Sequence, residues 1–119
     1  MRTALLTGEL DHVVERGLPV GAAVEGVRVV ALEDAGQRAT DAYDREHVTP
    51  WLRRGGRGLR IAQPDAPPTL FRPDIRLTVD TLDDLHMARA IARVVNLDEP
   101  VPLEHIIAAA DGMCLRRAA

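Results

Sequence analysis

The sequence predicts an α/β domain with a small mixed sheet and flanking helices, and three observations support this. Short runs rich in valine and isoleucine alternate with runs whose apolar residues recur at helical spacing. Clusters of glycine and proline separate the runs. Apolar residues make up 46% of the 119 residues, which is enough for one core, and 28% are charged. We therefore expect a single domain over residues 1–119.

The first third of the chain is expected to contain two strands. A short helix around Thr3–Thr7 comes first, followed by a strand near His12–Glu15. Gly17–Gly21 is bounded by glycine and contains proline, which is typical of a loop. Four valines in Val24–Val30 indicate a second strand, because β-branched residues favour extended backbone.

The next segments are expected to form two helices. Leu32–Ala39 has apolar residues at helical spacing, with acidic residues near its start. Asp44–Arg54 follows, where Pro50 stands either in a first turn or at a kink. Gly55–Gly58 ends this helix. One of its faces carries three apolar side chains: Val48, Trp51 and Leu52.

Two further strands are expected in the middle of the chain. Leu59–Ala62 is a short candidate, and in Ile75–Val79 apolar residues alternate with polar ones. The proline-rich segment Pro64–Pro73 between them predicts an irregular loop.

The last third is expected to be helical. Leu82–Val95 has a wide apolar stripe, with Thr81 as its N-cap and Asp84 completing an approximate capping box. Pro102–Ala110 predicts a final helix that ends before Gly112.

Charge and composition exclude several classes of function. The net charge is −3, which disfavours a general nucleic-acid binder because such proteins need a basic face. All 15 Lys-plus-Arg positions are arginine, so mechanisms that use a lysine of this chain are excluded. Cys114 alone can neither form an internal disulfide nor a cysteine-rich zinc site. No apolar run approaches the length of a membrane span and no signal sequence is recognisable, so we expect a cytoplasmic protein.

One candidate binding segment is the triplet Arg45, Glu46 and His47 at the start of a predicted helix. Arginine can hold a phosphate or carboxylate, glutamate can orient a ligand or a metal, and histidine can transfer protons. The alternative is a solvated helix face, which is the commoner arrangement for such a triplet taken alone.

A second candidate is Asp80, at a predicted junction between a strand and a helix. Open α/β sheets bind ligands at the carboxyl ends of strands, and one carboxylate with phosphate oxygens and water commonly holds Mg²⁺. The alternative is that Asp80 only helps to start the helix. The other histidines, His12, His86 and His105, lack metal-type spacing and are expected at the surface or the core edge.

Taken together, these segments resemble the spore-coat polysaccharide cytidylyltransferases, which are similar to the CMP-sugar synthetases. The resemblance lies in the motif DAYDREHVTPW of Asp41–Trp51 and in RPDIRLTVDTLDDL of Arg72–Leu85. Arg89–Ile91 continues the second motif. Gly17–Val30 resembles the family's Gly-Leu-Pro segment with its strand, and Leu103–Ile107 resembles its last helix.

The resemblance implies the fold of the C-terminal half of a nucleotide-diphospho-sugar transferase and an activity on CTP. The family joins CMP to a sugar or sugar-like acid, with Mg²⁺ neutralising the phosphates. Asp80 matches the family's metal-binding aspartate, and Arg45, Glu46 and His47 match the helix start near the acceptor.

The resemblance begins near the middle of the family's pattern. The family's phosphate-holding loop and an earlier metal-binding aspartate are not matched, and the family's Glu-Val-Phe is replaced by Glu25–Val27. It therefore implies a truncated nucleotidyltransferase-like domain, inactive alone, that is completed as a homodimer or by a nucleotide-binding chain in a hetero-complex. The alternative is a non-catalytic module that binds a sugar acid or nucleotide, or regulates a partner. A folded remnant without ligand chemistry is a third interpretation.

Overall fold

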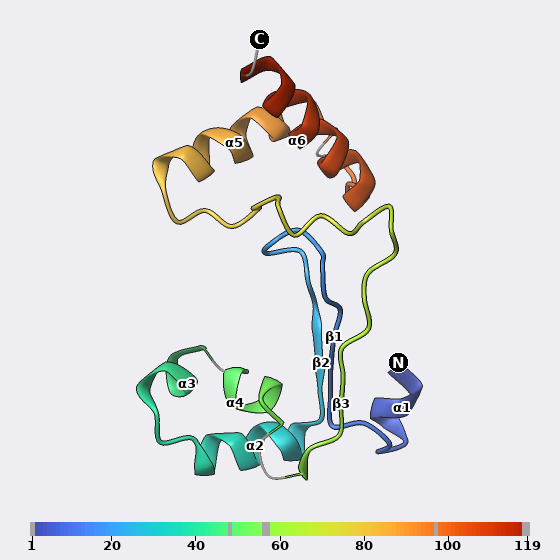
Figure 1. Cartoon of the computed structure of the whole chain (residues 1–119), viewed down its shortest axis with the longest axis vertical. Coiled ribbons are helices and arrows are strands. Elements are labelled where there is room, and N and C mark those ends of the chain that lie inside the picture. The colour runs from blue at the N-terminus through green and yellow to red at the C-terminus, as the bar shows by residue number, and fades with distance from the viewer. Residues whose placement is uncertain (1, 48, 56–57, 97, 118–119) are drawn as a thin grey trace. The chain divides into compact units, whose positions relative to one another are not determined.

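The computed structural model describes residues 2–47, 49–55, 58–96 and 98–117. These residues form two compact units, which are described separately (Figure 1). Unit 1 comprises Met1–Glu15 and Val24–Pro64, and unit 2 comprises Arg16–Ala23 and Asp65–Ala119. The division into two units does not test whether residues 1–119 form a single domain, which remains a prediction.

A three-stranded mixed sheet forms the centre of unit 1. β1 (His12–Val14) lies between β2 (Glu25–Val27) and β3 (Ile61–Ala62), antiparallel to β2 and parallel to β3. All three residues of β1 are buried, as expected for a central strand. This sheet with its flanking helices confirms the expected mixed α/β fold.

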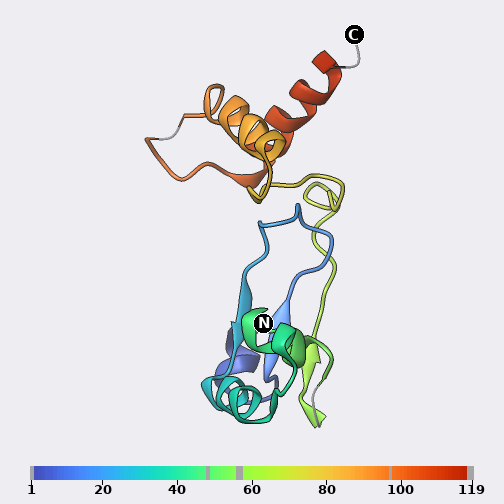
Figure 2. The same ribbon diagram turned by 90° about the vertical axis from the view of Figure 1, so that its left-hand side faces the viewer.

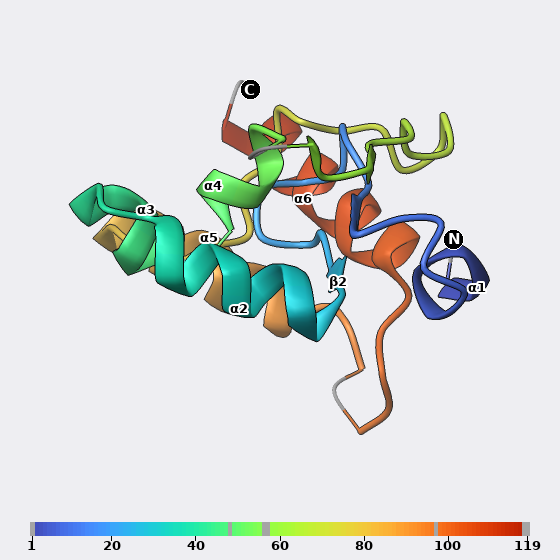
Figure 3. The same cartoon turned by 90° about the horizontal axis from the view of Figure 1, so that it is seen from below.

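The helices described beside this sheet are α1 (Arg2–Leu6), α2 (Val29–Arg38), α3 (Ala42–His47) and α4 (Pro50–Arg53). Figure 3 shows α3 and α4 beside α2, with α1 set apart from them. Ala31, Ala35 and Leu52 form a buried cluster between α2 and α4. Val27, Trp51 and Leu59 pack against it. Trp51 and Leu52 thus lie toward the core as expected, whereas Val48 is outside the described residues.

The strand expected over Val24–Val30 is shorter, and the following helix begins earlier than Leu32. The carbonyl of Arg28 accepts hydrogen bonds from the amides of Ala31 and Leu32, which starts α2 within the valine run. Placing a valine in a helix costs little free energy compared with the free energy gained by burying Ala31 and Ala35 in the cluster with Leu52.

The single helix expected over Asp44–Arg54 is two helices, with the break at Thr49. Pro50 occupies the first turn of α4, where its missing N–H leaves no hydrogen bond unmade. Within a continuous helix the same proline would lose a bond and clash with the preceding turn. Of the expected terminating segment Gly55–Gly58, the residues 56 and 57 are outside the described ranges.

Unit 2 contains a helical pair, α5 (Leu82–Ala92) and α6 (Leu103–Arg117), which lie side by side (Figure 2). Ile91 of α5 and Ile107 and Ala110 of α6 are buried. α6 continues beyond the predicted end at Ala110, because a glycine inside a helix costs only about 1 kcal/mol relative to alanine and does not by itself end it. The side chain of Cys114 lies outside the description.

The loops of unit 2 are joined by two isolated parallel bridges, Arg16 with Asp65 and Val20 with Arg76. The strand expected over Ile75–Val79 is reduced to the second bridge, in which Val20 bonds the carbonyl of Ile75 and the amide of Leu77. Alternating polar and apolar residues favour a strand, but a hydrogen-bonded sheet also needs a neighbouring segment that stays extended over the same length.

The Gly17–Gly21 loop forms as expected, and both of its glycines have positive φ, 84° and 96°. A Cβ at Gly17 would overlap the ring of Phe71, and one at Gly21 would press on Thr78 at 2.8 Å. Glycine is therefore required at both positions by conformation and by space. Within the described ranges, no helix combines the length and apolar character needed to cross a bilayer.

Candidate functional site

The triplet Arg45, Glu46 and His47 lies on α3 in unit 1, and all three residues are exposed. Arg45 Nη1 donates to the carbonyl oxygens of Gly36 at 3.4 Å and Ala39 at 3.3 Å. These carbonyls lie at the end of α2, where helical partners run out. Arg45 therefore already serves the structure by joining α3 to α2.

The other two triplet residues are placed toward the surface. The His47 ring lies 4.3 Å from the Tyr43 ring, centroid to centroid, one helical turn away. An exposed carboxylate at Glu46 next to an exposed imidazole at His47 offers acceptors and a donor to hydroxyl-bearing ligands. This pair is the part of the triplet best suited to contact a ligand.

A cavity of about 260 Å³ lies next to the triplet, between α2 and α3. Its walls are mostly apolar, with Asp44 and Arg45 on its polar side. Asp44 is buried and pairs with Arg54 through Oδ2, whereas its Oδ1 has no hydrogen-bond partner among the described residues. The cavity has space for a small part of a ligand, and of the triplet Arg45 lines it.

A polar network that reaches the segment after α3 and includes the buried His12 was not predicted from the sequence. His12, expected at the surface or the core edge, is 0% exposed, and its Nε2 lies 2.7 Å from Glu25 Oε2. Glu25 Oε1 accepts from Thr49 Oγ1 at 3.1 Å and from Arg53. A glutamate between valines in a predicted strand was the available signal, because such a residue needs buried partners.

The environment of Glu25 favours its ionised form. Burial alone would raise the pKa of its carboxyl, but hydrogen bonds from Arg53, His12 and Thr49 and the charge of Arg53 hold the pKa below 4.5. Glu25 is therefore a charged acceptor for three donors at neutral pH.

Another carboxylate of unit 1, that of Asp11, is buried and directly precedes β1. It accepts from the Arg60 backbone and guanidinium at 3.0–3.2 Å and from Arg28 at 3.2 Å. The hydrogen bonds from Arg60 hold the pKa of Asp11 at about 2, below its ordinary 3.8. Asp11 joins β1 to the segments before α2 and β3, and the contacts described for it do not reach α3.

Asp80 lies in unit 2, just before α5, and 61% of its side chain is exposed. It pairs with Arg76, and Arg76 also approaches Asp84 Oδ1 at 3.6 Å. Thr81 and Asp84 form the predicted capping box at the start of α5. The pKa of Asp84 is lowered, first by the hydrogen bond with Thr81. Asp80 thus precedes the helix as expected, but the strand that was expected to end at Val79 is reduced to a bridge at Arg76, so the expected junction between a strand and a helix is not formed there.

These residues do not make a dedicated metal site. Within the described ranges, no group of three or more His, Cys, Asp or Glu side chains is placed to hold a metal ion. Because the Asp80 carboxylate is paired with Arg76, Mg²⁺ there would need to displace the arginine and take most of its ligands from phosphates and water.

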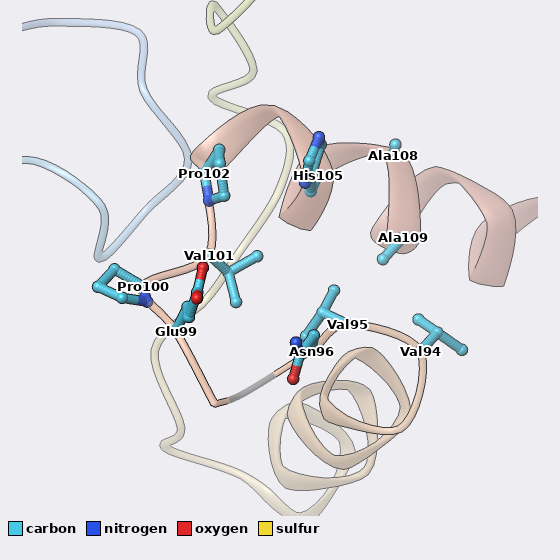
Figure 4. Close-up of a pocket in the computed structure, with 10 residues that line it drawn as sticks. All are labelled: Val94, Val95, Asn96, Glu99, Pro100, Val101, Pro102, His105, Ala108 and Ala109. Atoms are coloured by element: carbon cyan, nitrogen blue, oxygen red, sulfur yellow. The ribbon is translucent and has the colours of Figure 1, made fainter.

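Unit 2 contains its own cavities. The largest described, about 710 Å³, lies between α6 and the segment that follows α5 (Figure 4). Its polar groups are those of Asn96, Glu99 and His105. A cavity of about 220 Å³ beside Arg76 is lined by further charged residues, among them Asp83 and Asp84. The triplet and Asp80 belong to different units, and each is placed only within its own.

No protein-family model matches the chain. Over 97 residues it is 31% identical to an uncharacterized protein of Methanocaldococcus jannaschii, covering 79% of this chain and 40% of that protein. A solved cytidylyltransferase from Leptospira borgpetersenii matches 99% of this chain and 49% of its own, with a TM-score of 0.70 and 17% identity.

The chain thus spans less than half the length of both relatives. At 17% identity the structural likeness concerns the fold, in which side-chain roles can differ. The whole-chain match agrees with the resemblance found in the motifs. The chain therefore has a nucleotidyltransferase-like fold.

Proposed function

We propose that the chain is a cytidylyltransferase-like protein of sugar, polysaccharide or natural-product biosynthesis that contributes the acceptor side of the site. The observation that carries the proposal is the fold likeness to a cytidylyltransferase over 99% of the chain. The exposed Glu46 and His47 add support, since they belong to the same helix as Asp44 and Arg45, which line a cavity. A nucleotide-binding chain, or a second copy of this chain, completes the site in the cytoplasm.

In this proposal the chain holds the acceptor while CMP is transferred and pyrophosphate leaves. Glu46 accepts hydrogen bonds from acceptor hydroxyl groups, and His47 donates or accepts according to its tautomer. Positioning of the reacting groups supplies most of the chain's contribution. Mg²⁺ would be held by Asp80 together with nucleotide phosphates, where it would neutralise their charge.

A second candidate function is a non-catalytic binding or partner-regulating module. The observation that favours it is that two polar residues matching the family's motifs already make contacts within the chain. Arg45 bonds the end of α2, and Asp80 pairs with Arg76. Groups held in this way are less available to phosphates. The two functions differ in whether CMP transfer occurs once a nucleotide-binding chain is present.

Binding is tested first, by titrating the chain with CMP, CTP and a panel of acidic sugars in a calorimeter. We expect a sugar acid or nucleotide to bind, and E46A/H47A to weaken it at least about tenfold, because alanine removes both hydrogen-bonding side chains. The matched control is E104A/H105A, an adjacent Glu-His pair on α6 of unit 2. Equal losses in both variants, or no binding to the wild type, would contradict the proposal.

Activity is tested by pyrophosphate release with CTP, Mg²⁺ and the same sugars. We expect background rates for the chain alone and release above background with its nucleotide-binding partner. Continued inactivity of a stable complex that binds ligand would favour the non-catalytic module. A mass near twice 13.0 kDa in light scattering would identify a homodimer as the completed form. A monomer that captures no partner from its host would contradict the proposal that a second copy or a nucleotide-binding chain completes the site.

A further inference from the structure

We propose that His12 and Glu25 are positioning residues that set the orientation of α3, acting through Thr49. The contacts that carry this inference lie wholly within unit 1. Its consequence for ligand binding rests on the proposed function, whereas its consequence for α3 itself does not.

The first link is His12, which lies on the central strand of the sheet. Its side chain has no solvent exposure, and its backbone pairs with Val27 of β2 and Ile61 of β3. A residue held on both sides in this way has little freedom to move. Its Nε2, 2.7 Å from the Glu25 carboxylate, therefore provides a rigid support for that group.

The second link is Glu25, which transmits this support from the sheet to the start of α4. One carboxylate oxygen faces His12, and the other accepts from Thr49 and Arg53. Hydrogen bonds to an ionised acceptor are stronger and more directional than those between neutral groups. The carboxylate can make all of these contacts only in one narrow range of orientations.

The third link is Thr49, the N-cap position between α3 and α4. Its hydroxyl donates to Glu25 at 3.1 Å, and its amide donates to the carbonyl of His47 at 2.7 Å. The last residue of α3 is thus joined to Glu25 through a single intervening residue. Loss of the hydroxyl would release this end of α3 from the sheet.

The other part of α3 is held by Arg45, which bonds the carbonyls at the end of α2. With these two attachments and the ion pair of the buried Asp44 with Arg54 in place, the exposed Glu46 and His47 belong to a helix that has little freedom to rotate. A six-residue helix has almost no stability of its own, so its orientation must come from such tertiary contacts. His12 and Glu25 therefore determine the orientation in which Glu46 and His47 are presented.

The test uses Thr49→Val, which removes the hydroxyl at similar volume, and Thr49→Ser, which keeps it. We expect Thr49→Val to speed amide exchange at Arg45–His47 about tenfold, as for loss of one hydrogen bond to a charged group. The ring-current shift that Tyr43 imposes on the His47 protons should also decrease. Thr49→Ser should restore both signals.

A pair of His12 variants tests the link between His12 and Glu25 in the same way. His12→Gln keeps a donor for Glu25 and should resemble the wild type at α3 more closely than His12→Leu. Arg60→Gln is the matched control, because it weakens the Asp11 network in the same unit. It should lower stability without a selective change at α3.

The outcomes separate this inference from the proposed function. Unchanged exchange at Arg45–His47 and an unchanged His47 shift in Thr49→Val would overturn the positioning role. If both change but the wild type binds none of the CMP, CTP or sugar-acid probes, the positioning role stands and the proposed function fails. If both hold, Thr49→Val should weaken probe binding about tenfold, with recovery in Thr49→Ser.

Discussion

The two units differ in how they use the same kind of ion pair. In unit 1, three carboxylates of low exposure accept from arginines on other elements or loops; they are Asp11, Glu25 and Asp44. In unit 2, Asp65, Asp74 and Asp80 are more than 60% exposed, and two of them pair with an arginine two or four residues away. Charges therefore support tertiary structure in unit 1, but mostly local geometry in unit 2.

This difference has a physical cause. A sheet edge and a short helix bring polar backbone and side chains into the interior, and a buried carboxylate must be paired there. A helical pair such as α5 and α6 satisfies its own backbone and leaves its charges in water, where a pair contributes little. Unit 2 also has contacts between distant residues: Arg72 joins Asp74 to Asp111 of α6, and Arg16 pairs with Asp65, 49 residues away.

The largest effect is expected in the core of unit 1. Leu52→Ala should lower the free energy of unfolding by about 3 kcal/mol, because a fully buried leucine loses its contacts and leaves a cavity. Urea unfolding followed by Trp51 fluorescence measures it. Leu82→Ala is the control, since Leu82 is exposed and should change stability by less than about 0.5 kcal/mol. Similar losses in both variants would mean that α4 does not close this core.

The next effect compares a buried carboxylate with an exposed one. Asp11→Ala should destabilise by about 2 kcal/mol, because several charge-assisted hydrogen bonds are lost together. Asp65→Ala, which removes an exposed partner of Arg16, should cost less than about 0.5 kcal/mol. Chemical denaturation of the two variants gives the comparison. If the costs were equal, the contrast between the units would be wrong.

The same carboxylate predicts an acid transition. The pKa of Asp11 is about 2 in the folded chain and near 3.8 when unfolded, so the folded state binds fewer protons between these values. Its contribution, about 2 kcal/mol, is complete above pH 4–5 and is lost as the pH falls toward 2. Thermal unfolding from pH 6 to pH 2 should show a shallower decline for Asp11→Asn. If stability fell equally steeply with pH in the wild type and in Asp11→Asn, Asp11 would not be the cause of the acid transition.

The smallest effect is expected at the start of α5. Thr81→Ala removes the hydroxyl acceptor of the capping box and should cost about 1 kcal/mol. Amide exchange in the first turn of α5 measures it locally, while the amides of β1 and β2 should be unaffected. Thr69→Ala, in an exposed turn, should leave the exchange unchanged. A loss that extended into unit 1 would show that the two units unfold together.

Helices with a strong local signal were predictable. The capping box of α5 and its wide apolar stripe placed that helix within a few residues, because these signals act between neighbours in the chain. The exposed triplet on α3 was also recognisable, since its residue types recur in a known motif. The proline at Pro50 signalled a break, but not whether it would bend one helix or separate two.

The partners of Glu25 could not be predicted, because they come from β1, from the α3–α4 junction and from α4. Nothing in the sequence near His12 marks it as fully buried, since burial depends on which strands pair beside it. The length of the valine strand depended in the same way on the packing of Ala31 and Ala35.

By itself, the amino-acid order determined the α/β class, the loops rich in glycine and proline, and the cap of α5. Each of these follows from φ/ψ preferences or contacts a few residues apart. Only the tertiary structure decided that Arg45 bonds the end of α2 and that Glu25 joins the sheet to α4. Such contacts link residues distant in the chain, so their geometry exists only after the sheet and helices have packed.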